Sequence, residues 1–399
     1  MNDNTTQKNH NQEAYFLSDL KTNGKERPWR DKKIYSNSLS ESYGRLAKYE
    51  LTLAKSIARD MKHVKLLGDG DKLINFDEMI FRHERDAEYW TKKSMRSDLC
   101  ATCLLFKVMS DDSKKLHSAH FCQVRLCAMC SWRRELKVKS QLGQVVEEAS
   151  IEKYRFLLLT LTCKNVSGEE LSATIDNLFA SYQRLFQLSR IRKSVVGWFR
   201  ALEITHDTKR KITKKMYNER KDYYIRHGLQ AGDPNPNFNM YHPHFHVMLA
   251  VEPDYFKDPN KYIEHEEWQA MWKQSMRVNY NPMVNIKIVR NIKGKGIKET
   301  AKYTVKEVDY IVHEDKPLTD EIVRTLDRAL HARRLVAYGG LLRQIHKRLN
   351  LDENIDAEVN IDGEEETIKN EPKYLQEYKW SVGYKNYVLV ETNIDVNGW

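Results

Sequence analysis

The chain has 399 residues, and its 66 Lys and Arg against 56 Asp and Glu give a net charge of +10, which suits a polyanionic partner. No stretch approaches the roughly eighteen consecutive apolar residues of a membrane span, and the first thirty or so residues lack the apolar core of a signal peptide. We therefore expect a soluble, cytoplasmic protein of about two domains with no membrane partner.

The first quarter of the chain divides into a polar start and a helical region. Residues 1–35 hold few large apolar groups and are expected to be disordered. Apolar residues recur at helical spacing from Ser38 to Leu67, and residues 76–96 are also expected to be helical. We predict a helical region over residues 36–99, and we favour packing on the core of this chain over packing on a partner chain.

Five of the six cysteines fall between Cys100 and Cys130, which in a cytosolic chain favours metal binding over disulfides. Two Cys-x-x-Cys pairs supply thiolates for a tetrahedral, structural Zn²⁺ site: Cys100, Cys103, Cys127 and Cys130. The fourth ligand is open, and the candidate substitutes are Cys122, His117 and His120. The alternative is a group of ordinary buried cysteines. We expect residues 100–150 to form this zinc module.

The zinc module is expected to end in a helix from Trp132 to about Ser150. Arg133 and Arg134 at its start are candidate contacts to DNA phosphates, or simply part of a solvated helix face.

Strand and helix patterns alternate over residues 151–312. Nearly unbroken or alternating apolar runs predict strands at 154–163, 197–207, 241–251 and 284–290. Helices are predicted after the capping box of Ser167 and Glu170, and at 264–276 and 298–306. This order predicts an α+β fold of ferredoxin-like kind, an antiparallel sheet with helices packed on it.

The third of these strands carries two histidines at alternate positions. His244 and His246 lie on one strand face, where their imidazoles can share a divalent metal. Glu203, on the preceding predicted strand, offers a third ligand, and the set suits Mg²⁺ or Mn²⁺ acting on a phosphodiester. His242 is a lower-ranked ligand, because a proline follows it. The alternative is a pair of surface histidines on an edge strand.

The last predicted helix of this domain places Glu299 and Tyr303 one turn apart. Lys302 and Lys306 lie alongside them and are candidate contacts to DNA. A tyrosine oxygen that loses its proton can attack a phosphodiester and form a phosphotyrosine ester, whereas a glutamate can activate water at the same phosphate. The chain has 21 tyrosines, so packing is the alternative role, and Tyr310 is a second candidate nucleophile.

Two further regions complete the chain. The insertion 208–240 mixes basic residues with tyrosines, so we expect DNA contacts from Lys209, Arg210 and Lys211, with a solvated basic hairpin as the alternative. Residues 313–350 are expected to be helical, and residues 351–399 to be an acidic linker and a tail in which 378–390 could form a short hairpin.

Three segments together resemble the ordered motifs of the HUH endonucleases, and more narrowly the replication initiator (Rep) proteins of small rolling-circle plasmids. They are Phe-Leu-Leu-Leu-Thr-Leu-Thr at 156–162, His-Pro-His-Phe-His-Val-Met-Leu at 242–249 and Glu-Thr-Ala-Lys-Tyr-Thr-Val-Lys at 299–306. The cysteine-rich run 122–134 is similar to the same subfamily. The resemblance extends from about Cys100 to Asn350.

The resemblance implies a nickase and DNA strand transferase. His244 and His246, with Glu203 as the matched third ligand, hold a divalent cation at the scissile phosphate. Tyr303 attacks one strand at the double-strand origin, keeps the 5′ phosphate and frees a 3′-OH that primes leading-strand synthesis. Glu299 matches the glutamate of the hydrolytic termination step. The implied partners are origin DNA, single-stranded DNA, a host helicase with the replication machinery, and a second copy in a homodimer.

Two alternatives remain beside this reading. One is a sister enzyme of the same superfamily, a relaxase or single-strand transposase. The other is a zinc-dependent DNA-binding regulator without catalysis, which would bind the origin and form no covalent adduct.

Overall fold

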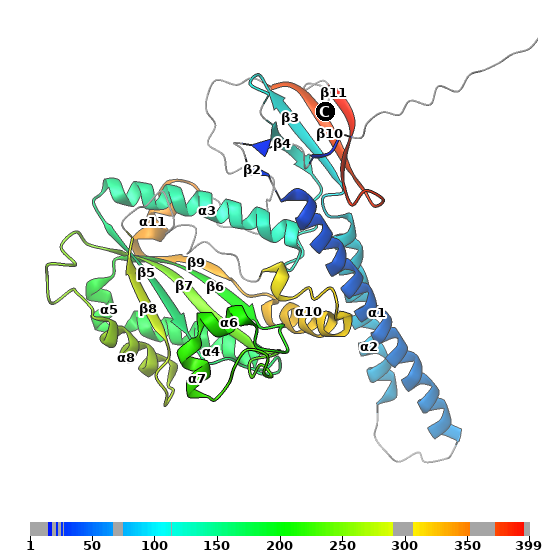
Figure 1. The fold of residues 1–399 in the computed structure, drawn as a ribbon, viewed down its shortest axis with the longest axis horizontal. Helices are drawn as coiled ribbons and strands as arrows, with labels where there is room; N and C mark the ends of the chain where they lie inside the picture. The colour runs from blue at the N-terminus through cyan, green and yellow to red at the C-terminus, as the bar shows by residue number, and fades with distance from the viewer. Residues whose placement is uncertain are drawn as a thin grey trace, which may run out of the picture.

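Two antiparallel sheets, with helices packed on and beside them, make up the computed structural model (Figure 1). This arrangement confirms the predicted α+β class. The structure describes residues 15–17, 21–22, 25–26, 28–66, 75–112, 114–289, 306–351 and 372–394. The predicted helix at 298–306 lies outside this range except for Lys306, and so do three candidate site residues: Glu299, Lys302 and Tyr303.

The larger sheet has five strands in the order β8-β5-β7-β6-β9. Four of them are the predicted strands, and the fifth, β9, lies at an edge in a segment expected to be helical. Their bounds are β5 Arg155–Thr162, β6 Gly197–His206, β7 Tyr241–Val251, β8 Val284–Ile288 and β9 Val336–Gly339. The central strand β7 pairs with β5 over His244–Val251 and with β6 over Tyr241–Ala250, which fixes the register of the site residues on it.

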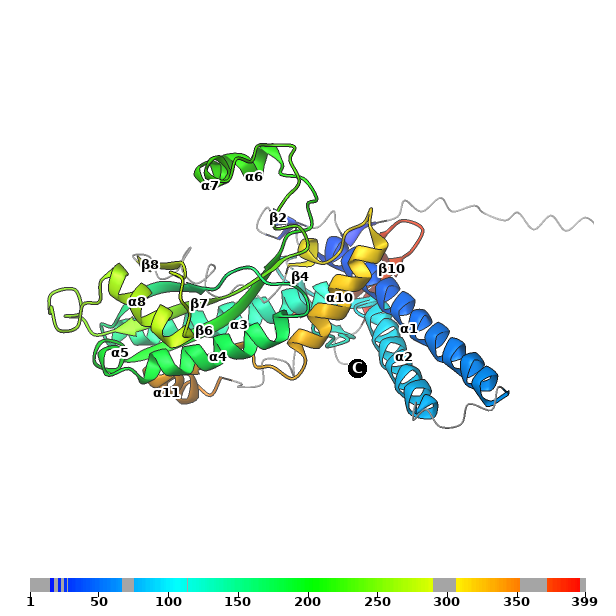
Figure 2. The ribbon, with the colours of Figure 1, turned by 90° about the horizontal axis from the view of Figure 1, so that it is seen from below.

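Helices cover both faces of this sheet (Figures 1 and 2). One face carries α4 (Leu171–Gln187), α5 (Ser189–Ser194) and α8 (His265–Met276), and the other carries α3 (Ala128–Ile151) and α11 (Gly340–Arg348). The faces alternate along β7 as period two requires. Phe245 packs on α4 through Phe179, whereas Met248 belongs to the second core with α3.

The predicted capping box is present at the start of α4. The Ser167 backbone N–H and hydroxyl both donate to the Glu170 carboxylate, at 3.0 and 2.9 Å, and the Glu170 N–H donates back to the Ser167 hydroxyl at 3.4 Å. The helix itself begins at the next residue, Leu171.

An antiparallel pair of long helices, α1 (Trp29–Leu66) and α2 (Phe76–Leu99), projects from the sheets (Figure 1). The helix α1 begins inside the segment expected to be disordered, which corrects that boundary. The reason is Trp29, which is 2% exposed and packs edge-on against Phe106 and Trp132. Burial of this ring gives the first turn of α1 a tertiary anchor that its polar sequence does not reveal.

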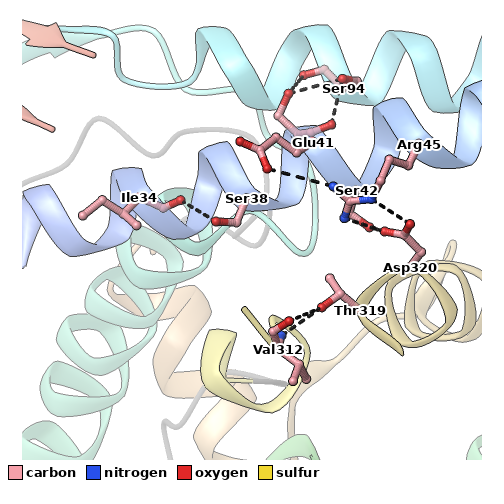
Figure 3. Close-up of polar contacts among 10 residues, drawn as sticks. Ile34, Ser38, Glu41, Ser42, Arg45, Ser94, Val312, Thr319 and Asp320 are labelled. Carbon is pink, nitrogen blue, oxygen red and sulfur yellow. Dashed lines mark hydrogen bonds and ion pairs between the residues drawn. The ribbon is translucent and has the colours of Figure 1, made fainter. Parts of the chain in front are cut away.

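The helix α10 (Lys316–Leu330) holds the long helices against the rest of the chain (Figure 3). Asp320 accepts two hydrogen bonds of 2.8 Å from Arg45 and one of 2.6 Å from Ser42, both on α1. Two turns on, the buried Asp327 accepts from Tyr43, Tyr89 and Lys93. Bidentate and shared carboxylate contacts of this kind fix the orientation of a helix pair. The N-terminal helices thus pack on this chain, as expected.

The smaller sheet joins distant parts of the sequence in the order β11-β10-β3-β4. Its strands are β3 Cys103–Met109, β4 Lys114–Ala119, β10 Pro372–Ser381 and β11 Asn386–Ile394. The expected C-terminal hairpin therefore exists, is longer than predicted, and pairs through β10 with the cysteine-rich module. The end of the chain is a structural part of that module and not a separate tail.

The insertion between β6 and β7 holds two short helices, α6 (Lys214–Glu219) and α7 (Lys221–Arg226). Figure 2 shows them extended away from the helices that cover the sheet. The remaining short elements are β1 (Lys21–Thr22), β2 (Lys25–Glu26) and the 3₁₀ turn η2 (Glu307–Asp309). Within the described ranges, none of the helices combines the length and apolar character that crossing a membrane requires.

Candidate metal centres and nucleic-acid interface

Three predicted ligands meet on one face of the larger sheet. Glu203 on β6 pairs directly with His244 on β7, and His246 lies two residues further along the same face. One ligand atom from each of the three lies within 4.8 Å of the others. Neighbouring antiparallel strands bring such cross-strand and diagonal side chains together. The register of β6 and β7 therefore builds a carboxylate–bis-imidazole cluster.

The donor atoms of this cluster converge on one another. The Nε2 of His246 lies 2.6 Å from Oε2 of Glu203, and the Nε2 of His244 lies 3.4 Å from the same oxygen. The two imidazole Nε2 atoms are 3.2 Å apart. The Nδ1 of His244 lies 3.0 Å from the carbonyl of His242, which fixes the orientation of the ring. This donor set fits a divalent cation with oxygen and imidazole ligands.

Burial sets the electrostatics of the cluster. Glu203 is 4% exposed and His244 is 8% exposed. Burial by itself raises the pKa of Glu203, but the hydrogen bonds from His244 and His246 outweigh it and hold that pKa well below its usual range. The carboxylate is therefore charged and available as a ligand throughout the neutral range.

His242, the lower-ranked candidate, stays outside the group of three. Its ring centroid is 5.1 Å from that of His244, and its Nδ1 is buried without a hydrogen-bond partner among the described residues. Burial, together with a smaller effect of the neighbouring His244, lowers the pKa of His242 to about 4. A neutral imidazole next to the cluster is the result.

A cavity of about 160 Å³ lies beside His246, between β5, β7 and β8. It is lined in part by Thr160, Asn285 and Lys287, none of which the sequence analysis singled out. Thr160 pairs with both His246 and Asn285 across the sheet, so the three form one row. Alternation along β5 and β8 next to the histidine strand was the signal that could have found them. The row gives the cluster a polar neighbour on its β8 side.

Four cysteine thiols form a second cluster, fully buried, at the junction of α1, α3 and the smaller sheet: Cys100, Cys122, Cys127 and Cys130. Three of the Sγ–Sγ distances are 3.5, 3.6 and 3.6 Å. A tetrahedral Zn²⁺ with Zn–S bonds of about 2.3 Å separates its sulfurs by about 3.8 Å. The four thiols therefore match the size and geometry of a structural zinc site, which the cysteine pattern predicted.

The set of four differs from the predicted one at a single position. Cys122 supplies the fourth thiol, and Cys103 lies outside the cluster, as do His117 and His120. The backbone of Ala101 adopts a left-handed φ of 51°, after which Cys103 begins β3 and its thiol donates to Glu377 of β10 at 3.0 Å. Strand pairing with the C-terminal hairpin thus turns Cys103 away from the other thiols.

The helix α1 contributes polar groups to the cysteine cluster. The hydroxyl of Ser36 lies 3.0 Å from the Sγ of Cys127, and the buried ammonium of Lys33 donates to the carbonyl of Cys100 at 2.8 Å. Burial lowers the pKa of Lys33, although the nearby cysteines and Asp98 raise it. A buried cation beside four thiolates offsets part of the negative charge that a Zn²⁺ ion with four thiolates carries.

The candidate DNA contacts at the start of α3 are corrected by their burial. Arg133 is 1% exposed and lies over the rings of Trp29, Phe121 and Trp132. Arg134 is 2% exposed and donates to the carbonyl of Gln123 at 2.9 Å. Both side chains pack inside the molecule because the helix begins at Ala128 and turns this face inward. Neither belongs to a surface that DNA phosphates can reach.

The other basic candidates are on the surface. Lys209 and Lys211 are exposed at the base of the α6–α7 insertion. Arg210 between them is also exposed, forms an ion pair of 2.8 Å with Asp315, and lies over the Phe238 ring at 4.5 Å. Lys306 is exposed as well. These side chains are accessible to a polyanion, as expected of phosphate contacts.

The segment that follows the candidate nucleophile is fixed to the sheet. His206, at the end of β6, contacts the carbonyl of Asp309 at 3.1 Å and Asn239 at 2.9 Å. Tyr310, the second candidate nucleophile, is 1% exposed and donates its hydroxyl to the carbonyl of Leu126. The Tyr310 hydroxyl is therefore buried and hydrogen-bonded inside the protein. His206 follows Glu203 by three residues on β6, so this contact places Asp309 at the end of the strand that carries Glu203.

Comparisons with known proteins agree with this geometry. A family described as "Replication protein" matches residues 113–388. "Protein rep" of Bacillus amyloliquefaciens is 34% identical over 401 residues, covering 94% of this chain and 97% of that protein. "Protein rep" of Streptococcus pneumoniae serotype 2 (strain D39) is 34% identical over 363 residues, covering 89% and 90%. No solved structure matches the chain significantly. The chain therefore belongs to the replication (Rep) protein family of rolling-circle plasmids.

Proposed function

We propose that this Rep protein initiates replication by nicking one strand at its plasmid's double-strand origin. The observation that carries the proposal is the convergence of Glu203, His244 and His246 within 4.8 Å on paired strands. A Mg²⁺ or Mn²⁺ ion held by these three residues would supply Lewis-acid stabilisation of negative charge on the scissile phosphate. Glu203 and His244 are nearly buried, so their positions are set before DNA binds.

The bond changes follow from the roles proposed for two residues outside the described range. The Tyr303 oxygen loses its proton and attacks the phosphorus, the P–O3′ bond breaks, and a 5′-phosphotyrosine and a free 3′-OH result. The 3′-OH primes leading-strand synthesis. At termination, strand transfer or water activated by Glu299 releases the covalent strand. The buried Tyr310 hydroxyl supports Tyr303 as the nucleophile by elimination of the second candidate.

The site beside His246 supports a single-stranded substrate. Thr160, Asn285 and Lys287 continue the polar row from the cluster to the edge strand β8, and Lys287 is exposed. Phosphate and sugar groups of an unpaired strand suit such a mixture of hydroxyl, amide and ammonium donors. The α6–α7 insertion, with Lys209 and Lys211 at its base, would contact the flanking origin DNA.

A covalent-adduct assay tests the proposal. The protein is mixed with supercoiled DNA carrying its coding region and flanks, with Mn²⁺ or Mg²⁺, and is then digested for mass spectrometry. A nucleotide on the peptide containing Tyr303, absent with EDTA and in Tyr303→Phe, would establish the nickase and locate the nick. Tight binding to that DNA without any adduct would instead indicate a DNA-binding regulator.

A further inference from the structure

A pocket of about 500 Å³ opens on the sheet face opposite Glu203, between α4, the strand β6 and the segment that precedes β9. Its walls hold four aromatic rings and three guanidinium groups, including those of Phe179, Tyr182, Phe186, Trp198, Arg200 and Arg334. Trp198 and Arg200 alternate with Glu203 along β6, so they point to the other side of the sheet. The pocket is therefore separate from the carboxylate–bis-imidazole cluster.

The aromatic wall is built to leave flat surfaces. Tyr182 stacks on Phe186 with ring centroids 4.4 Å apart, and Trp198 meets Tyr182 edge-on at 5.1 Å. The Trp198 indole lies directly against Gly339 of β9, where a Cβ atom would approach the ring to 2.2 Å. Glycine at this position therefore lets the indole lie along the floor of the pocket. Flat aromatic faces of this kind accept a planar π-system by stacking.

Arg200 is the unusual member of this lining. It is 8% exposed, and its guanidinium lies over the rings of Phe179, Phe245 and Tyr182 at 4.4, 4.9 and 5.1 Å. Its Nε is buried and has no hydrogen-bond partner among the described residues, and the same is true of the Tyr182 hydroxyl, on a side chain that is 3% exposed. A buried guanidinium N–H and a buried hydroxyl without hydrogen-bond partners are costly to fold unless a ligand satisfies them.

The positive charges around the pocket favour an anionic ligand. Arg334 is exposed at its mouth and lies close enough to Arg200 for the two positive charges to repel. Arg333 is already paired with Asp176 at 2.7 Å. In the part of the chain that the structure describes, no carboxylate forms an ion pair with Arg200 or Arg334. Burial lowers the pKa of Arg200 to about 10, which leaves it charged at neutral pH.

We propose that this pocket binds a nucleotide, with the base stacked on the aromatic wall and the phosphate between Arg200 and Arg334. A planar base can stack on the aromatic rings while its phosphate binds the guanidinium groups. The pocket volume of about 500 Å³ is in the range of small-ligand sites. A free nucleotide and one unit of a DNA strand share this chemistry. The proposal is independent of strand cleavage, since the pocket faces away from Glu203.

Photo-crosslinking tests the proposal on the full-length protein. The probes are 5-iodo-2′-deoxyuridine 5′-monophosphate and a pentanucleotide of the same base, irradiated in EDTA so that metal-dependent nicking plays no part. Crosslinked peptides are identified by mass spectrometry, and affinity is measured by fluorescence anisotropy of a labelled form of each probe that crosslinks in the pocket. The test variant is Arg334→Glu, and the matched control is Arg343→Glu on α11, which is exposed and packs on the opposite face.

The expected result is a crosslink to the peptide of Tyr182 and Phe186 or to that of Trp198, and a loss of affinity of at least about tenfold in Arg334→Glu but not in Arg343→Glu. If only the mononucleotide crosslinks there, the pocket serves free nucleotides, and if the pentanucleotide does so too, it also takes a DNA strand. Crosslinks confined to other peptides, or equal affinities for the two variants, would overturn the proposal. An Arg200→Lys variant that folds normally should also lose affinity, because lysine cannot replace the guanidinium geometry.

Discussion

The Nε2 of His246 and the Oε2 of Glu203 lie 2.6 Å apart, although 43 positions separate the two residues in the chain. The contact exists because β6 and β7 pair in a register that sets Glu203 opposite His244 and diagonal to His246. A shift of one residue would move both imidazoles to the opposite face of the sheet. The first prediction tests this carboxylate directly.

Glu203→Gln should weaken Mn²⁺ binding by at least about a hundredfold, because loss of a charged ligand costs more than the 10–100-fold typical of outer-sphere partners. The variant keeps the side-chain volume, so its far-ultraviolet circular dichroism should not change. Isothermal titration with Mn²⁺ measures the effect, and Glu169→Gln, an exposed carboxylate on the same domain, is the control. Equal Mn²⁺ affinity in the two variants would remove Glu203 from the ligand set.

Cys122→Ser should lower the affinity for Zn²⁺ by at least about a hundredfold, whereas Cys103→Ser should keep the zinc content of the parent protein. The reason is that Cys122 is a member of the thiol cluster and Cys103 is not. Metal analysis after dialysis against a weak chelator compares the two variants. The reverse order of zinc loss would restore Cys103 as the ligand.

The Cys103 thiol should react with iodoacetamide slowly near neutral pH. Burial, helped by the hydrogen bond to Glu377, raises the pKa of Cys103 to about 12. Only the thiolate reacts, so the rate should rise about hundredfold between pH 8 and pH 10, where a thiol of ordinary pKa rises only about tenfold. Mass spectrometry of alkylated native protein follows the rate, with an unfolded sample as the control. A tenfold rise in the native protein would contradict the raised pKa.

Replacing Lys209, Arg210 and Lys211 by alanine should weaken binding to origin DNA and reduce the salt slope by up to about 2.7, since each phosphate contact contributes about 0.9. A reduction nearer two is expected, because Arg210 is already paired with Asp315. Anisotropy titrations at several salt concentrations give the slope. The control is the double variant Arg343→Ala with Lys347→Ala, which changes two exposed residues of α11. An unchanged salt slope in the triple variant would show that the insertion is a solvated hairpin without DNA contacts.

Glu299→Ala should still nick supercoiled DNA at a rate within a few-fold of the parent but release the covalent strand at least about a hundredfold more slowly, the usual range for loss of a general base. Gel assays that follow nicked circles and protein–DNA adducts separately measure both steps. Glu314→Ala, an exposed glutamate after the same segment, is the control. Normal release in Glu299→Ala would assign water activation to another group.

Local sequence patterns were sufficient for the parts of this protein that depend on neighbours in the chain. The period-two alternation of Tyr241–Val251 predicts both the strand and the shared face of His244 and His246, because side-chain direction in a strand is fixed by residue parity. The cysteine spacing likewise predicts a metal-binding module. The capping box of Ser167 and Glu170 is also local, and all its contacts are present.

Only the tertiary structure decided the questions that depend on contacts between distant segments. Spacing favours Cys103, which forms a Cys-x-x-Cys pair with Cys100, over Cys122, but pairing of β3 with the C-terminal β10 turns Cys103 away from the other thiols. The sequence alone indicates that Arg133 is a surface cation, but Trp29 from α1 packs against its guanidinium. Arg200 becomes part of a pocket only when α4 and the segment before β9 come together beside β6. Periodicity determines which face a side chain takes, whereas long-range packing determines what that face meets.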